Sequence, residues 1–216
     1  MNILVIGANS QISRHLLQYI LEGGRHRAKV MLQNKAQEAY FNEKGIDNFI
    51  YKNEESTEKF VKAVQNMDAL VIAEHSIDHI QTDPLDEIDE TIKLLEALKH
   101  TQIKRIVHIS TFETSKADWN HLPVYFRPIM IKNYYIDKWI RLSSFAYTII
   151  HPGQLNDKKG TGSVKVINKD VNRGEISRED VAKLVLACLD NQSTIQKEFK
   201  VISGEISIFE AINSCV

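Results

Sequence analysis

Short runs of consecutive apolar residues recur along the first 150 residues, separated by longer stretches in which apolar positions follow a helical period. Each run is apolar throughout rather than at every second position, which is typical of a strand covered on both faces, as in a parallel sheet between helices. The runs that predict strands are NILVI (2–6), AKVML (28–32), NFIY (48–51), ALVIA (69–73), RIVHIS (105–110) and AYTII (146–150).

Two of the intervening stretches have the period of an amphipathic helix. ISRHLLQYILEGG ends at Gly23 and Gly24, which favours a glycine C-cap there. DEIDETIKLLEALKH begins with an acidic turn, which favours a helix N-terminus. The residues expected on the buried faces are Ile12, Leu16, Leu17 and Ile20 in the first helix and Ile88, Ile92, Leu95 and Leu98 in the second.

This alternation of strand and helix predicts an α/β fold with a doubly wound parallel sheet. No internal repeat, low-complexity tract or Pro/Gly-rich linker divides the chain. We therefore expect one domain over residues 1–216, with the later segments forming a small C-terminal lobe over the carboxyl ends of the strands.

The alternation fails over residues 111–127 and 151–177. Long connections at the carboxyl ends of parallel strands are where ligands bind in open α/β sheets, so the functional site is expected there. The first stretch carries four aromatic residues, which favour local packing over a substrate wall. They are Phe112, Trp119, Tyr125 and Phe126.

Composition excludes several partners. The 27 Lys and Arg residues nearly balance 28 Asp and Glu residues, so no strong basic field attracts nucleic acid or an anionic membrane. No apolar run approaches the roughly 18 residues of a membrane span, and the chain opens directly with a strand pattern. Cys188 and Cys215 match no metal spacing and are expected to be reduced. These features predict a cytoplasmic protein with no nucleic-acid or membrane partner.

The segment GANSQIS, residues 7–13, lies where a dinucleotide-binding turn would follow the first strand. Gly7 is kept, but Ser10 and Ser13 stand at the second and third glycine positions, where each adds a Cβ. The helix N-terminus still offers N–H groups, and a serine hydroxyl can donate to phosphate. Either a weakened dinucleotide site or a turn with no ligand is compatible with this segment.

Few other motifs carry chemistry. His75 and His79 in EHSIDH have a metal-binding spacing if Glu74 or Asp83 completes the site, but a polar loop is the favoured interpretation, so no metal is expected. The chain contains no GxSxG elbow, Walker-type lysine loop or Cys/His nucleophile arrangement.

Taken together, ILVIGANSQIS, IKRIVHIST, YTIIHPG, GTGSVKV and GEISREDVAKLVLACLD resemble the atypical short-chain dehydrogenase/reductase family over nearly the whole chain. The branch they resemble is that of the small bacterial NAD(P)H-binding proteins, which are NmrA-like or flavin-reductase-like. The resemblance implies a Rossmann core, with the nicotinamide near Ser110 and Thr111 and under a loop that begins at His151.

The resemblance also implies which residues contact the dinucleotide. At the end of the second strand, Gln33 replaces the arginine that pairs with the 2′-phosphate of NADP, leaving Asn34 and Lys35 either as substitutes or as solvated loop residues. Lys52 either contacts a phosphate or is a solvated lysine. His151 either titrates near neutrality and responds to charge in the site, or is simply hydrogen-bonded. NADP is favoured over NAD. The implied contacts are Gly7, Asn9, Ser10, Gln11, Ile12, Gln33, Asn34, Lys35, Lys52, Ala73, Ser110, His151 and Pro152.

The family's catalytic Tyr and Lys fall on Ile129 and Asn133 here, neither of which is an acid at neutral pH. Tyr134 and Lys138 have the right mutual spacing, but a shift of five residues turns them by about 140° at roughly 100° per residue. We interpret them as an ordinary helix face. Ser110 and Thr111 remain as weak catalytic candidates, or as a strand-end cap.

Three functions stay open. The resemblance implies an NAD(P)H-dependent oxidoreductase that reduces a flavin- or quinone-like acceptor. The missing pair does not forbid this reaction, because solvent can supply the proton. The degenerate turn and missing pair also fit a non-catalytic dinucleotide sensor that acts through a protein partner, or a scaffold that binds no cofactor.

Overall fold

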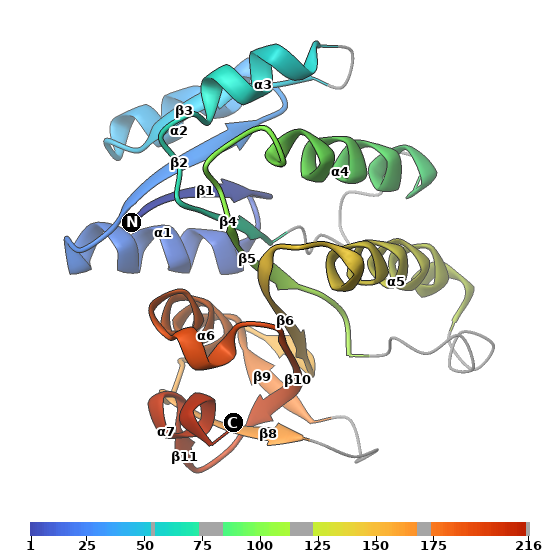
Figure 1. Ribbon diagram of the computed structural model, residues 1–216. Coiled ribbons are helices and arrows are strands. Elements are labelled where there is room, and N and C mark those ends of the chain that lie inside the picture. Colours follow the sequence, from blue (N-terminus) through green and yellow to red (C-terminus); the bar gives the residue numbers. More distant parts are fainter. Residues whose placement is uncertain (53–54, 74–83, 113–122, 168–173, 215–216) are drawn as a thin grey trace.

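A nine-stranded sheet forms the centre of the protein (Figure 1). The structure, a computed structural model, describes residues 1–52, 55–73, 84–112, 123–167 and 174–214. Along the sheet the strands are β3 (Asp47–Ile50), β2 (Arg27–Leu32), β1 (Asn2–Ile6), β4 (Ala69–Ile72), β5 (Arg105–Ile109), β6 (Ala146–Pro152), β10 (Lys197–Ser203), β8 (Ser163–Ile167) and β11 (Ile206–Ser207). The strands from β3 to β10 in this order are parallel, and β8 and β11 continue the sheet antiparallel.

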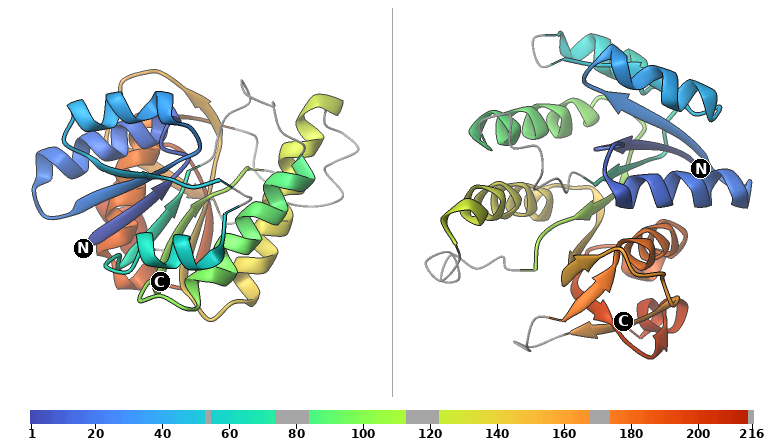
Figure 2. Two further views of the ribbon diagram at one scale, coloured as in Figure 1. Left: turned by 90° about the horizontal axis from the view of Figure 1, so that it is seen from above. Right: turned by 180° about the vertical axis from the view of Figure 1, so that it is seen from behind.

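Helices cover both faces of the sheet (Figure 2). One face carries α1 (Gln11–Gly23), α2 (Glu38–Glu43), α6 (Arg178–Asp190) and α7 (Ile208–Asn213), and the other carries α3 (Thr57–Ala63), α4 (Pro84–Leu98) and α5 (Arg127–Leu142). Short 3₁₀ turns are η1 (Lys35–Gln37), η3 (Val124–Phe126) and η4 (Gln192–Thr194). No helix in the described part of the chain is long and apolar enough to cross a membrane.

The strand-helix alternation predicted from the sequence is confirmed. In β1, Ile3 and Val5 pack against one helical layer and Leu4 and Ile6 against the other, which is why the run is apolar throughout. The C-cap of α1 is Gly24, with a φ of 63° and its N–H bonded to the carbonyl of Ile20, as Gly-rich helix ends favour. The doubly wound fold class is therefore confirmed.

The resemblance implied a loop that begins at His151. This prediction is wrong, because β6 continues through His151 and Pro152. His151 and Pro152 are the last two residues of β6, and both are buried. The chain leaves the sheet at Gly153 and forms β7 (Gln154–Asn156), which pairs with β9 (Glu175–Ser177). The additional strand residues arise because β10 pairs in parallel with β6 as far as Pro152.

The ISREDVA segment has a structural role at the start of α6. Ser177 caps the helix by accepting from the N–H of Asp180. The Asp180 carboxylate accepts from the backbone N–H groups of Thr161 and Gly162, at 2.9 and 2.8 Å, and Glu179 accepts from Gly160 at 2.7 Å. The two acidic side chains thus hold the GTG loop that leads into β8.

Arg105, the first residue of β5, ties the sheet to the end of α6. Its guanidinium is buried and donates to the carbonyls of Ile106, Ala146 and Cys188 and to the hydroxyls of Thr148 and Thr194. Burial lowers the pKa of Arg105 from its usual value. Because no carboxylate is among these partners, backbone and hydroxyl acceptors alone compensate for its desolvation.

Candidate functional site

The predicted site residues come from the carboxyl ends of five adjacent strands. Gly7 follows β1, Gln33 follows β2, Ala73 follows β4, and Ser110 follows β5, while His151 lies at the end of β6. Parallel strands end at one edge of a sheet, so residues up to 144 positions apart in sequence, such as those at 7 and 151, share this edge. The sheet therefore collects these candidates on one side of the molecule.

The turn after β1 is built on Gly7, whose φ is 77°. Only glycine adopts this conformation without strain, which explains why this glycine is kept. Ser10 is the N-cap of α1 and accepts from the N–H of Ser13 at 3.1 Å. The Ser10 hydroxyl also donates to Ser13, whose hydroxyl donates to the carbonyl of Gly7 at 2.9 Å. Both serine hydroxyls therefore bond within the turn.

The turn still fits a phosphate. The N–H groups of Gln11 and Ile12 donate to no acceptor in the described ranges, and they form the first turn of a 13-residue helix. Unpaired N–H groups and the helix dipole attract an anion at such a terminus. Ser13 is fully buried and its hydroxyl donates to Gly7, so its side chain lies in the contact between α1 and the turn after β1. Asn9 and Gln11 are exposed and Ile12 is buried.

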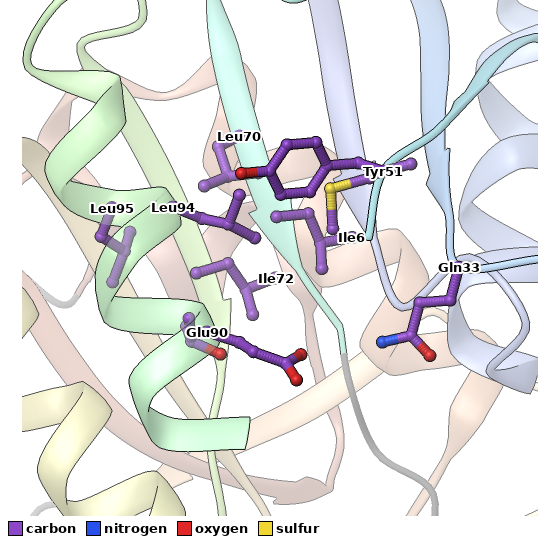
Figure 3. A pocket seen from close by; sticks show the side chains of 10 residues that line it. Ile6, Gln33, Tyr51, Leu70, Ile72, Glu90, Leu94 and Leu95 are labelled. Atoms are coloured by element: carbon purple, nitrogen blue, oxygen red, sulfur yellow. The ribbon is translucent and has the colours of Figure 1, made fainter. Parts of the chain in front are cut away.

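A narrow cavity of about 20 Å³ opens beside the end of β2 (Figure 3). Its walls are apolar side chains of β1, β2, β4 and α4, together with Tyr51. Gln33 and Glu90 point toward one another at its edge (Figure 3). A cavity of this size has room for about one water.

The remaining candidates near β2 and β3 are solvated. Asn34 and Lys35 are exposed, and Lys35 begins η1. Lys52 is also exposed, and its backbone N–H donates to Glu55. Ala73 is fully buried and its N–H donates to the carbonyl of Ile6, which extends the ladder between β1 and β4 by one bond.

The hydroxyl of Ser110 is committed to a buried carboxylate. It donates to Oδ2 of Asp137 on α5 at 2.7 Å, and both residues are fully buried. His108 Nε2 lies 3.3 Å from Oδ1 of the same carboxylate, and neither ring nitrogen of His108 has a hydrogen-bond partner within the described residues. Thr111 is also buried. Ser110 thus acts as part of a buried cluster that the sequence did not indicate.

His151 connects the end of β5 to β10. Its Nδ1 lies 2.7 Å from the carbonyl oxygen of Thr111 and its Nε2 lies 2.7 Å from Oε1 of Glu198. Arg141 donates to both oxygens of Glu198 at 2.6 Å. Burial raises the pKa of Glu198, but the hydrogen bonds from Arg141 and His151 outweigh it and hold the pKa at about 2.

His151 stands at the position where the resembling sequences carry arginine. Its two ring nitrogens face a backbone carbonyl oxygen, that of Thr111, and a carboxylate oxygen, that of Glu198. Because His151 is only 2% exposed, these two groups rather than solvent surround the ring nitrogens.

Of the two positions of the missing catalytic pair, Ile129 on α5 is half-buried and Asn133 is buried. The amide of Asn133 donates to the carbonyl of Ile129 at 3.1 Å. Tyr134 is half-buried and contacts the ring of Tyr135 edge-to-face, while Lys138 is exposed. The interpretation of Tyr134 and Lys138 as an ordinary helix face stays a prediction.

Comparison with known proteins decides the family. The model of an NAD(P)H-binding family matches residues 7–192. The chain belongs to the NAD(P)H-binding family. The uncharacterized sugar epimerase YhfK of Bacillus subtilis (strain 168) is 32% identical over 215 residues, which are 98% of this chain and 99% of that protein. The resemblance to atypical short-chain dehydrogenases/reductases is thereby confirmed.

Solved structures support the same fold. A candidate NAD-dependent epimerase/dehydratase from Bacillus halodurans has a TM-score of 0.86 and 30% identity, with 99% of both chains covered. A short-chain dehydrogenase/reductase from Veillonella parvula DSM 2008, in complex with NADP, has a TM-score of 0.75 and 16% identity, covering 95% of this chain and 96% of that one. At that identity the second match concerns the fold alone.

Some predictions for this NAD(P)H-binding protein fall outside the described residues. These are the histidine pair His75 and His79 with Glu74 and Asp83, the aromatic Trp119, the side chain of Tyr125, and Cys215. Cys188 is buried with a free thiol. No cluster of three or more metal-ligating side chains occurs in the part of the chain that the structure describes.

Three polar residues of the site were missed in the sequence. Asp137, Arg141 and Glu198 lie within a helix and a strand and belong to no motif. Asp137 does fall four residues after Asn133, on the same helix face, and a carboxylate on a buried face is a usable signal. Glu198 gives no such signal, because its partners lie in other elements.

Proposed function

We propose that this chain binds NADP(H) and passes hydride to a planar, flavin- or quinone-like acceptor. Binding is supported by the family match and by the turn, where Gly7 and the N–H groups of Gln11 and Ile12 fit a pyrophosphate. The adenosine would lie over Gln33, and the nicotinamide near the ends of β5 and β6. The reduced nicotinamide supplies the hydride when it is bound.

The observation that carries the choice of acceptor is the absence of an acid at positions 129 and 133. Oxidation of a sugar hydroxyl needs a base to take its proton, and neither Ile129 nor Asn133, whose amide is bonded to a carbonyl, can serve. Epimerase chemistry, suggested by the names of two relatives, is therefore disfavoured. A flavin or quinone accepts hydride at a conjugated centre and takes its proton from solvent, so it needs no tyrosine.

The testing experiment has two parts. Titration with NADPH and NADH, followed by nicotinamide fluorescence and melting temperature, measures binding, because a ligand of the native state raises the melting temperature. Oxidation of NADPH is then measured with flavins, quinones and sugar nucleotides. The proposal expects oxidation with the first two classes only, and the same rate in Tyr134→Phe. A large loss of rate in that variant would show that Tyr134 is the proton donor.

A second candidate is a dinucleotide sensor without turnover. It is favoured by the buried hydroxyl of Ser110, whose hydrogen is already donated to Asp137 and so is not offered to a substrate. Tight binding of NADPH with no oxidation across all acceptors would support the sensor. If neither NADPH nor NADH binds, both candidate functions are refuted.

A further inference from the structure

A groove of about 260 Å³ runs along α1, and α2 with the turn before β3 forms its other wall. The residues that line it on α1 recur at helical spacing from Gln11, the first residue of the helix, to Leu21 in its last turn. At 1.5 Å per residue this stretch is about 15 Å long. A groove of that length between two helices has the shape to take an extended segment of polypeptide.

The Leu21 end of the groove offers an apolar contact. Leu21 is 48% exposed, and the lining also includes Leu17 and Ile46, which are buried. Covering an exposed leucine with another apolar group is favourable, because it removes apolar surface from water. Glu22 accepts a hydrogen bond from the Gln18 amide at 2.8 Å in the same part of α1, which disfavours a second anion there. This end therefore fits an apolar side chain.

The other end of the groove is cationic. The Arg14 guanidinium carbon lies 5.2 Å and the Lys44 ammonium 5.3 Å from the ring centroid of Tyr40. Neither cation forms an ion pair or a side-chain hydrogen bond with a residue that the structure describes. The Tyr40 ring packs edge-to-face on buried Phe41, with ring centroids 5.1 Å apart. Two cations held on one fixed ring repel each other, and an anion bound by both relieves this repulsion.

We propose that this groove docks an acidic peptide segment of a partner protein. An Asp or Glu of the segment pairs with Arg14 and Lys44, and an apolar side chain covers Leu21. From Arg14 to Leu21 the helix rises about 10 Å, which an extended peptide spans in about three residues. The segment is therefore expected to carry an acidic and an apolar residue about three positions apart.

The groove favours a peptide over other anions. Nucleic acid and anionic membranes are bound through many phosphate contacts, whereas no Lys or Arg besides Arg14 and Lys44 is among the described residues that line this groove. Tyrosine and arginine are the side chains that most often dominate the free energy of protein-protein contacts, and here they are stacked on each other. The proposal is independent of dinucleotide binding, because Arg14, Lys44 and Leu21 lie outside the dinucleotide site proposed above.

The test is a fluorescence anisotropy titration of the full chain against fluorescein-labelled peptides. The reference peptide carries Glu and Leu three positions apart, in either chain direction. In three matched peptides the Glu is replaced by Gln, the Leu by Ser, or the two residues are made adjacent. We expect a dissociation constant of about 10–100 µM for the reference peptide, and binding at least about fivefold weaker for each matched peptide. Binding should also weaken as the salt concentration is raised.

Variants of the chain locate the binding. Arg14→Gln is expected to weaken the reference peptide about tenfold, and Lys44→Gln and Leu21→Gln about threefold each. The matched controls are Arg27→Gln, at an exposed residue that begins β2, and Leu142→Gln, at a 79% exposed residue that ends α5. Both controls should change the affinity less than about twofold. Melting temperatures and NADPH titrations of all the variants should match those of the wild type.

Several results would overturn the proposal. One is that no peptide binds with a dissociation constant below about 1 mM. Others are equal affinity for the reference peptide and its Gln or Ser counterpart, or affinity that the groove variants leave unchanged. A dimer in sedimentation velocity that Arg14→Glu dissociates would show that a second copy of the chain occupies the groove. Peptide binding without dinucleotide binding would leave this proposal standing and refute the proposed function.

Discussion

Replacement of Glu198 by glutamine removes the one anion that His151 and Arg141 share. Glu198 accepts three hydrogen bonds, two from Arg141 at 2.6 Å and one from His151 at 2.7 Å. Glutamine keeps the shape, but its NH₂ group faces a donor and its neutral amide cannot compensate the charge of Arg141. His151 is nearly fully buried, so its Nε2 would lose the carboxylate beside it with little solvent to replace that partner.

Two independent routes give the magnitude. A fall of the pKa of Glu198 from 4.5 to about 2 corresponds to roughly 3 kcal/mol at 1.36 kcal/mol per pH unit, and discounting for a side chain that is 31% exposed leaves roughly 2 kcal/mol. Loss of two of three charge-assisted hydrogen bonds at about 1.5 kcal/mol each gives roughly 3 kcal/mol. We expect Glu198→Gln to lower the free energy of unfolding by about 2–3 kcal/mol at pH 7, or about 4–12 °C in melting temperature.

The pH dependence has a definite sign. The pKa of Glu198 is lower in the folded chain than in the unfolded chain, so its contribution is complete above about pH 4.5 and is lost as the pH falls toward 2. The difference between wild type and Glu198→Gln should therefore shrink by roughly half between pH 7 and pH 3. Urea unfolding followed by circular dichroism measures both values.

The control is Glu205→Gln, which makes the same chemical change at an exposed residue two positions after β10. It is expected to change the free energy of unfolding by less than about 0.5 kcal/mol. Two results would refute the reasoning. One is a loss at Glu198 as small as that of the control, and the other is a loss that stays the same at pH 7 and pH 3.

Three further predictions concern stability. Gly160→Ala should lower the free energy of unfolding by about 1–3 kcal/mol, because the added Cβ would lie 2.6 Å from Oδ1 of Asp180. The control is Gly23→Ala, where no atom lies within 4 Å of the added Cβ, and it should raise the free energy of unfolding by about 0.5–1 kcal/mol. Equal effects of the two substitutions in urea unfolding would contradict the packing argument. Arg105→Met should cost about 2–4 kcal/mol in urea unfolding by leaving buried acceptors unpaired, with unchanged NADPH affinity, since Arg105 starts β5 at the opposite edge. Ser13→Gly should lower the free energy of unfolding by about 1–2 kcal/mol, because the Ser13 hydroxyl donates to the carbonyl of Gly7 in the turn. The same variant should change NADPH affinity less than threefold in a fluorescence titration. A large gain in affinity would show that the serine crowds the phosphate.

The sequence by itself determined the layered fold and the edge of the sheet at which the candidate site residues lie. Continuous apolar runs depend only on neighbouring residues, so β1 to β6 were predicted to within two residues at either end. The glycine C-cap of α1 and the tight turn at Gly7 could also be read locally, because each depends on the backbone conformation of one residue. Parallel topology then placed the strand ends at one edge.

Only the tertiary structure decided what the polar side chains at that edge do. The hydroxyl of Ser110 donates to Asp137, which lies 27 residues later on α5. The ring of His151 contacts Glu198, which lies 47 residues later on β10. The hydroxyls of Ser10 and Ser13 bond to each other, and that of Ser13 also bonds to the carbonyl of Gly7. Helical and strand periods are properties of near neighbours, whereas a hydrogen bond or a charge pair depends on which elements the sheet order brings together. The pattern of the chain therefore determines which edge of the sheet carries the candidate site residues, and only long-range packing determines which of their side chains are already bonded to other residues.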